Sequence, residues 1–238
     1  MNRLAGVSPN VTARLAAALL LITMVTGACT QAFVGGRLIA SGDAAATATN
    51  IVSHEALFRL GFAIYLVEMA CQIAMTVLFY GLFKPADKAA SLLAASFGLV
   101  GCTVKTMSRL FFIAPLLVLG GAHYLNVFDP RQLQALALLF LRVNYTAETI
   151  AMVLFGFSGL VRAYLVFRST FLPRVLGVFS AAGGLGWLLY LYEPLARRVE
   201  SSIVGIALVG ALATALWLLV KGVDERRWRE QAEAQRSL

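Results

Sequence analysis

The chain has 238 residues, of which 60% are hydrophobic and 13% are charged. A soluble domain is close to half apolar and one quarter charged, so this composition excludes an ordinary soluble enzyme or binding domain and indicates an integral membrane protein. The net charge of +8 does not indicate nucleic-acid binding, because the basic residues form no run with interleaved aromatic residues and lie at the ends of apolar segments.

The apolar residues are concentrated in six segments, and about 20 such residues cross the roughly 30 Å of hydrocarbon in a bilayer. We expect an all-α integral membrane protein, a bundle of six transmembrane helices with short surface helices in the first and third loops. The spans are expected at about residues 11–33, 58–83, 89–119, 141–167, 175–191 and 201–220. Residues 1–220 then form one transmembrane domain, and residues 221–238 form a polar cytoplasmic tail.

Capping signals predict the surface helices in two loops. In the first loop, Asp43 can cap a helix that begins at Ala44, and Ser53 can cap the next helix. In the third loop, Asp129-Pro130 combines a capping aspartate with a proline in the first turn. We expect that helix to run through Leu133–Phe140 and into the fourth span.

The lysine and arginine residues that flank the spans predict the orientation in the membrane. Eleven lie on the side of the N-terminus and five lie on the opposite side. The positive-inside rule therefore places both termini in the cytoplasm, for a protein of a bacterial cytoplasmic membrane. The eleven are Arg3, Arg14, Lys84, Lys88, Arg168, Arg174, Lys221, Arg226, Arg227, Arg229 and Arg236, and the five are Arg37, Arg59, Arg131, Arg197 and Arg198.

Three stretches of the chain resemble a known family. They are Gly42–Ile51 with Glu55–Gly61, Phe128–Pro130 with Gln132–Leu141, and Tyr164–Ser169 with Leu172–Gly177. In this order they resemble an uncharacterised bacterial family of multi-pass membrane proteins, domain of unknown function 4386, over nearly the whole chain. The resemblance implies the architecture and brings no activity. Members of that family often have histidines where this chain has Asn144 and Ser158, so a histidine-based role does not carry over.

Five ionisable residues lie well inside the predicted spans, namely Glu68, Lys105, Arg109, Arg142 and Glu148. Left unpaired, five charges would cost upward of about 12 kcal/mol on insertion scales, so they must face inward and pair or reach water. Depth along the helices, counted at about 1.5 Å per residue, predicts two layers of ion pairs. One layer joins Glu68 with Arg109 and Arg142, and the other joins Lys105 with Glu148.

Helical spacing places other polar side chains beside these charges. The candidate ligand-binding cluster comprises Glu68, Gln72, Lys105, Arg109, Arg142, Asn144, Tyr145 and Glu148. Because the five charges sum to +1, we expect a small polar or anionic ligand in a polar interior between the first four helices. The alternative is an ion-pair network that fixes only the helix register, in a structural or regulatory subunit that acts through a protein partner. In both cases the lipid bilayer surrounds the protein, and no nucleic acid is involved.

No residue pattern specifies a reaction. Gly156-Phe157-Ser158-Gly159 has the Gly-x-Ser-Gly form of rhomboid intramembrane proteases, but the sixth predicted span has no histidine to take the serine's proton. Both histidines of the chain, His54 and His123, fall in outer loops, which excludes bis-histidine haem in the bilayer. The three cysteines lack metal-ligand spacing. We expect no catalytic residues, no metal and no cofactor, and a lipid-modifying enzyme is the least favoured alternative.

Overall fold

The computed structural model describes residues 8–40 and 42–235, apart from the side chain of Glu193. The described residues form helices joined by short connections, with no strand among them. Six segments are long and apolar enough to cross a membrane, namely Pro9–Leu38, Glu55–Phe83, Lys88–Leu119, Pro130–Arg168, Arg174–Leu191 and Pro194–Val220. The predicted all-α, multi-pass membrane architecture is therefore confirmed. Arg3 and Arg236, which entered the topology count, lie outside the described residues.

The spanning segments are built from six long helices and a few short turns. The long helices are α1 (Pro9–Thr30), α4 (Glu55–Phe83), α5 (Lys88–Leu119), α6 (Pro130–Arg168), α7 (Arg174–Leu188) and α8 (Glu193–Val220). A π-helical turn (Gln31–Gly35) and the short α2 (Gly36–Leu38) extend α1, and a 3-10 turn (Leu189–Leu191) extends α7. The other helical segments of the described residues are too short to cross a bilayer, namely α3 (Ala44–Ser53), a 3-10 turn (His123–Leu125) and α9 (Glu225–Ala234).

The chain divides into two compact units, and each has its own core. The first unit comprises Met1–Ile22, Cys71–Cys102 and Ile150–Leu238, and the second comprises Thr23–Ala70 and Thr103–Thr149. Helices α1, α4, α5 and α6 contribute residues to both units. Helices α7 to α9 belong to the first unit alone, and α2 and α3 belong to the second alone.

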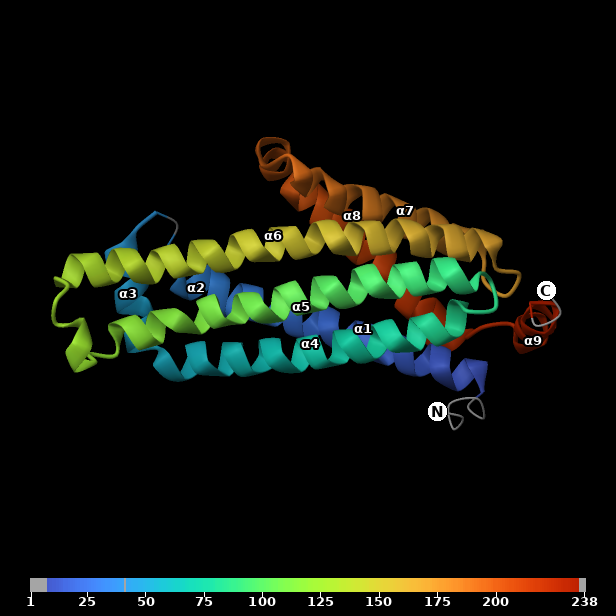
Figure 1. The fold of residues 1–238 in the computed structure, drawn as a ribbon, viewed down its shortest axis with the longest axis horizontal. Helices are drawn as coiled ribbons and strands as arrows, with labels where there is room; N and C mark the ends of the chain where they lie inside the picture. Colours follow the sequence, from blue (N-terminus) through green and yellow to red (C-terminus); the bar gives the residue numbers. More distant parts are fainter. Residues whose placement is uncertain (1–7, 41, 236–238) are drawn as a thin grey trace. The chain divides into compact units, whose positions relative to one another are not determined.

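In the first unit, small residues allow α6 and α7 to pack closely. A Cβ atom added to Gly184 of α7 would lie 2.9 Å from the carbonyl oxygen of Gly156 in α6. The hydroxyl of Ser180 donates a hydrogen bond to the carbonyl of Gly159, at 2.9 Å. The glycines of the Gly-x-Ser-Gly sequence thus serve helix packing, as expected for small residues at helix interfaces in membranes. Helices α7 and α8 form an antiparallel hairpin within this unit (Figure 1).

The C-terminal helix α9 is docked against the ends of the spanning helices of the first unit. The indole N–H of Trp228 donates to the carbonyl of Leu82 at the end of α4, at 2.9 Å. The side-chain amide of Gln231 donates to the carbonyl of Arg168, the last residue of α6, at 3.0 Å. The backbone N–H of Val223 donates to Asn10 Oδ1, at 2.8 Å, so the segment before α9 lies beside the start of α1 (Figure 1). The bonds to Leu82 and Arg168 satisfy backbone carbonyls at helix ends, which have no partner within their own helices.

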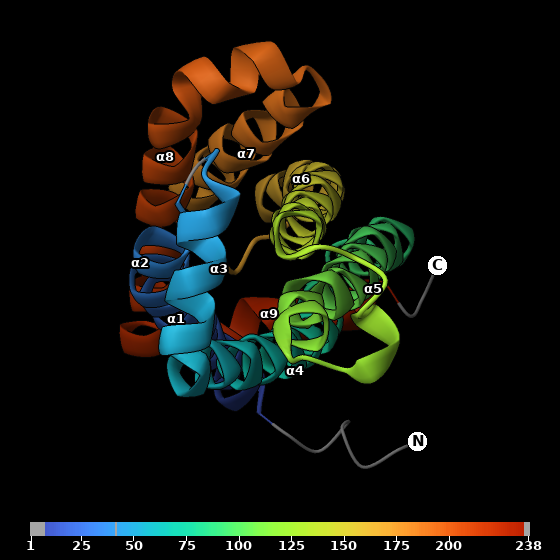
Figure 2. The ribbon, with the colours of Figure 1, turned by 90° about the vertical axis from the view of Figure 1, so that its left-hand side faces the viewer.

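In the second unit, both predicted capping aspartates act as expected. Asp43 Oδ1 accepts a hydrogen bond from the N–H of Ala46 at 2.9 Å, which caps α3. Asp129 and Gln132 exchange two hydrogen bonds of 2.9 Å at the start of α6, in a reciprocal capping arrangement. The expected cap at Ser53 is wrong, because this residue is the last of α3 and α4 begins at Glu55. Figure 2 shows α3 crossing beside α2.

An aromatic group forms part of the core of the second unit. The rings of Phe58 and Phe112 stack with centroids 4.5 Å apart. The ring of Tyr65 meets Phe112 edge-on, with centroids 5.2 Å apart. Phe58 and Tyr65 belong to α4 and Phe112 belongs to α5, so this group fixes the lateral contact between the two helices one turn away from their charged residues.

Candidate functional site

Four charged residues of the second unit pair with one another inside the spanning helices, and we call them the charge cluster: Glu68 of α4, Lys105 and Arg109 of α5, and Glu148 of α6. Arg109 is 1% exposed, Glu68 is 4% exposed and Lys105 is 9% exposed. The side chain of Glu148 is 22% exposed. The predicted inward orientation is therefore confirmed for these four residues, as the cost of a charge in lipid requires, and it is wrong for Arg142, which is exposed.

The ion pairs differ from the predicted ones. Lys105 Nζ lies 2.8 Å from Glu68 Oε1, and Arg109 pairs with Glu148. Arg109 Nη1 also donates to Asn144 Oδ1, at 3.3 Å. The expected pairs, Glu68 with Arg109 and Lys105 with Glu148, are wrong: the cations and carboxylates are the expected ones, but their partners are exchanged.

Helix length and side-chain reach explain the exchange. The predicted second span begins at Phe58, whereas α4 begins three residues earlier, at Glu55. Glu68 therefore lies about 4.5 Å farther from the helix start than the predicted span implies, at a depth that matches Lys105. The arginine side chain is long enough to contact two residues one turn apart on α6, and Asn144 and Glu148 have that spacing.

The aromatic face of Tyr65 completes the surroundings of Arg109. The central guanidinium carbon lies 3.7 Å from the centroid of the Tyr65 ring. This cation–π contact stabilises a desolvated guanidinium. Tyr65 is not part of the predicted ligand-binding cluster, although helical spacing places it on the same face of α4 as Glu68. Spacing alone does not distinguish a ring that covers the guanidinium from one that only packs in the core.

Arg142 lies outside the charge cluster, and two further residues of the predicted site are only half-buried. Arg142 is exposed, and no carboxylate in the described part of the chain pairs with it. At about 100° per residue, it points away from the helix face that carries Asn144. Gln72 belongs to the first unit and is half-buried, and Tyr145 is half-buried in the second. Without Arg142, the charge cluster has two cations and two carboxylates, so its formal charge is zero and not +1.

Several polar atoms of the charge cluster have no hydrogen-bond partner among residues 8–40 and 42–235. They are Glu68 Oε2, Arg109 Nε and Arg109 Nη2, all of them buried. Buried polar atoms almost always have partners in folded proteins, so each exception needs an explanation. Here the unpartnered groups are an acceptor on α4 and two donors on α5, inside the same cluster.

Helix α1 approaches the charge cluster at a glycine. A Cβ atom added to Gly27 would lie 3.6 Å from Glu68 Oε1. The π-helical turn of Gln31–Gly35 begins one turn later. Such turns interrupt the regular hydrogen bonding of a helix and occur frequently at functional sites. The irregular backbone of α1 is thus close to the polar interior of the unit.

The described residues offer no support for a serine protease or a metal centre. The hydroxyl of Ser158 donates to the carbonyl of Ala94 at 2.8 Å, so it joins α6 to α5. No three His, Cys, Asp or Glu side chains in residues 8–40 and 42–235 gather where they could hold a metal ion. The chemistry available in the charge cluster is hydrogen bonding and ion pairing.

Comparison with known proteins places these residues within one family model. A model described as domain of unknown function (DUF4386) matches residues 15–222. The matched segment includes the whole charge cluster and all six spanning helices apart from the first turns of α1. No curated protein and no solved structure matches the chain.

Proposed function

The chain belongs to the family described as domain of unknown function DUF4386, and from its own residues we propose that this multi-pass membrane protein binds a small polar molecule at the charge cluster. The observation that carries the proposal is the set of three buried atoms without partners, Glu68 Oε2, Arg109 Nε and Arg109 Nη2. A bound molecule that donates to the carboxylate and accepts from the guanidinium would satisfy all three.

The charge balance favours a neutral or zwitterionic ligand. The two cations and two carboxylates of the charge cluster cancel, which removes the reason to expect an anion. The site offers one acceptor and two donors that have no hydrogen-bond partner among the described residues. A molecule with separate donor and acceptor groups fits this arrangement. The π-helical turn of Gln31–Gly35 in α1 offers a segment that can rearrange locally when such a molecule enters.

A second candidate function is that of a structural or regulatory subunit that acts through a protein partner. The pairing of Lys105 with Glu68 and of Arg109 with Glu148 favours it, because complete internal neutralisation serves helix register without any ligand. In that case ordered water satisfies the three unpartnered atoms.

The orientation follows from the distribution of basic residues, and we propose that both termini are cytoplasmic. The hydrogen bond between Val223 and Asn10 supports placing the two ends of the spanning region on one side of the membrane. A bacterial cytoplasmic membrane remains the proposed location.

Analysis of small molecules that co-purify with the protein tests the ligand. The full chain is purified in lipid nanodiscs, and released compounds are identified by mass spectrometry. We expect the wild-type protein and Glu55→Gln to retain the same polar compound in near-stoichiometric amount, and Glu68→Gln to lose it. Glu55 is the matched control, because it forms an exposed pair with Arg59 on the same helix. Equal retention in all three proteins, or no compound in any of them, contradicts the proposal and favours the subunit role.

A further inference from the structure

The first unit contains an intramembrane cation that has no carboxylate partner. Arg162 lies in α6, six residues before its end at Arg168. In the described part of the chain, no aspartate or glutamate pairs with it, and its one charge contact is with the ring of Phe79, whose centroid lies 5.4 Å from the guanidinium carbon. The charge cluster keeps its cations in pairs, whereas Arg162 has none. An unpaired cation inside a span is a candidate functional residue by default.

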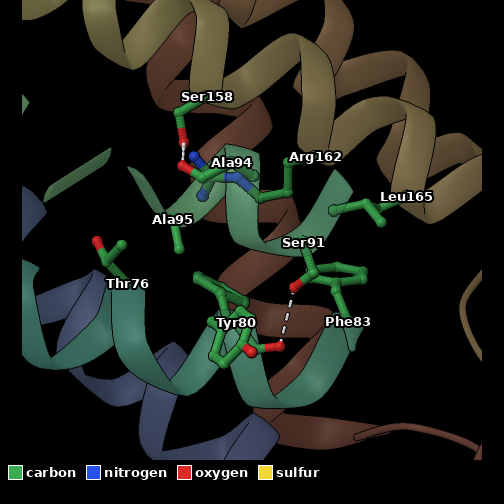
Figure 3. Close-up of a pocket in the computed structure, with 10 residues that line it drawn as sticks. Thr76, Tyr80, Phe83, Ser91, Ala94, Ala95, Ser158, Arg162 and Leu165 are labelled. Atoms are coloured by element: carbon green, nitrogen blue, oxygen red, sulfur yellow. Dashed lines mark hydrogen bonds between the residues drawn. The ribbon is translucent and has the colours of Figure 1, made fainter. Parts of the chain in front are cut away.

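Arg162 lines a pocket between α4, α5 and α6. Its side chain points toward Ala94 and Ser158, while Tyr80 and Ser91 line the other side (Figure 3). The enclosed space holds about one water molecule, and the pocket is partly open. No carboxylate is among the lining residues. The pocket therefore has a net positive charge that nothing in its lining neutralises.

The hydroxyl groups of the pocket are mostly used within the protein. Ser91 donates to the carbonyl of Tyr80 at 2.9 Å, and Ser158 donates to the carbonyl of Ala94 at 2.8 Å. The guanidinium of Arg162 makes no hydrogen bond within the described residues, which leaves its five donors for an external acceptor. Donors fixed on a planar guanidinium match the oxygen atoms of a phosphate group.

The pocket lies near the ends of the spanning helices, within reach of lipid headgroups. Arg162 lies about 9 Å along α6 from the helix end, and Ser91 lies in the first turn of α5, which begins at Lys88. The headgroup layer occupies several ångströms on each side of the hydrocarbon. Lys84 follows the last residue of α4 and Lys88 is the first residue of α5, so basic residues lie at this end of the unit. Basic pockets between helices at this level bind anionic headgroups.

We propose that the Arg162 pocket binds a phosphate-type oxyanion, with one oxygen atom against the guanidinium and the remainder of the group at the pocket mouth. Two sources have this chemistry, an anionic phospholipid and free phosphate. The site lies in the first unit and shares no residue with the charge cluster, so it is independent of the ligand proposed there.

Native mass spectrometry of the full chain tests the lipid source. The protein is released from nanodiscs that contain phosphatidylglycerol and phosphatidylcholine in equal amounts. We expect the wild type to keep one phosphatidylglycerol molecule at an activation energy that removes phosphatidylcholine. Arg162→Gln should retain roughly tenfold less, as expected for the loss of a charge-assisted contact. Arg168→Gln is the matched control, because it removes an exposed arginine of the same helix and should retain the lipid.

A phosphate titration distinguishes the second source. The thermal unfolding of delipidated protein in detergent is followed with added inorganic phosphate. The site is assigned to free phosphate if two results are found together. Phosphate stabilises the wild type and Arg168→Gln but not Arg162→Gln, and no lipid is retained in the first experiment. Arg162→Lys keeps the positive charge and should retain an intermediate amount of ligand, which provides a second variant if Arg162→Gln does not fold. The proposal is overturned if neither ligand binds, or if substitutions at Arg162 and Arg168 have equal effects.

Discussion

Arg109 shows how an arginine can be accommodated inside a membrane protein at 1% exposure. Glu148 neutralises its charge, Asn144 accepts one of its hydrogen bonds, and the ring of Tyr65 covers its face. Removing one partner of a buried pair is more costly than replacing both, because it leaves an uncompensated charge in a region of low dielectric.

Replacing Glu148 with glutamine tests this pair. The substitution retains the side-chain shape and removes the charge, so Arg109 loses its counter-ion. We expect the free energy of unfolding in detergent to fall by about 1–3 kcal/mol, less than for a fully buried pair because Glu148 is partly exposed. The control Glu55→Gln affects an exposed pair and should change it by less than about 1 kcal/mol. Equal effects of the two substitutions would show that the Arg109–Glu148 pair does not stabilise the fold.

Glu225 provides a residue whose effect on stability depends on pH. The hydroxyl of Ser8 donates a hydrogen bond to its carboxylate and lowers the pKa of Glu225 below its ordinary value of 4.5. A depressed folded-state pKa contributes stability above the unfolded-state pKa, and this contribution is lost as the pH falls through the folded-state value. Wild type should therefore exceed Ser8→Ala in stability above about pH 4.5, and the difference should shrink below it.

Melting temperatures from pH 3 to pH 7 give this comparison. In a Glu225→Gln background, the carboxylate no longer titrates, so the effect of Ser8→Ala should not vary with pH. A pH-dependent difference in that background would assign the titration to another group.

At the residue level, the sequence predicts which charged side chains face the protein interior better than it predicts their ion-pair partners. Helical spacing placed Lys105, Arg109 and Glu68 on buried faces, because one face of each helix must avoid lipid. The ion-pair partner of each charged residue depends on the length of its side chain and on the residue at which each helix begins. Helical spacing alone determines neither. Arg142 is exposed because it lies two residues before Asn144, about 200° around α6 from the face that carries Asn144 and Glu148.

At the level of the helices, close packing of α6 and α7 depends on the absence of side chains at facing glycines. A Cβ at Gly184 would lie 2.9 Å from the Gly156 carbonyl oxygen and 3.0 Å from the backbone nitrogen of Leu160. Both are backbone atoms, so the helices themselves would have to separate. Packing between helices in a bilayer lacks the hydrophobic effect as a driving force and therefore depends on such contacts.

Gly184→Ala should therefore destabilise the protein by about 1–3 kcal/mol, as for an overpacked core. The matched control is Gly205→Ala in α8, where an added Cβ has no neighbour within 4 Å. That substitution should be neutral or should stabilise the protein by up to about 1 kcal/mol through helix propensity. Denaturant titration of both variants in the same detergent measures the difference. Equal stability of the two variants would contradict the close approach.

Helix existence could be predicted from sequence to a large extent, and helix docking could not. The apolar segments and the capping residues Asp43 and Asp129 specified helices through local interactions. The docking of α9 depends on bonds such as that from Trp228 to Leu82, which are 146 residues apart in the chain. No local pattern specifies such a contact: the sequence predicts a polar, helical tail but not where that tail docks.

At the level of the whole molecule, the orientation in the membrane is open to a direct test. Reporter domains fused after Lys84, Pro173 and Leu238 should all be cytoplasmic if the chain has six spans and a cytoplasmic N-terminus. Alkaline phosphatase, active only outside the cytoplasm, should be inactive at each site, and green fluorescent protein should fluoresce at each. A fusion after Val127, between α5 and α6, is the control and should show the opposite pattern. An active phosphatase at any of the first three sites would contradict this topology.

The hydrogen bond from Val223 to Asn10 has a consequence for how the protein is made. Helix α1 is synthesised long before Val223, whose backbone N–H binds Asn10 near the start of α1. Until the last spanning helix has entered the bilayer, Asn10, the carbonyl of Leu82 and that of Arg168 must all remain without their final partners. Assembly of this unit is thus completed only after translation of α9, and a nascent chain stalled before residue 223 would expose the same unfinished surface to the quality-control proteases of the membrane.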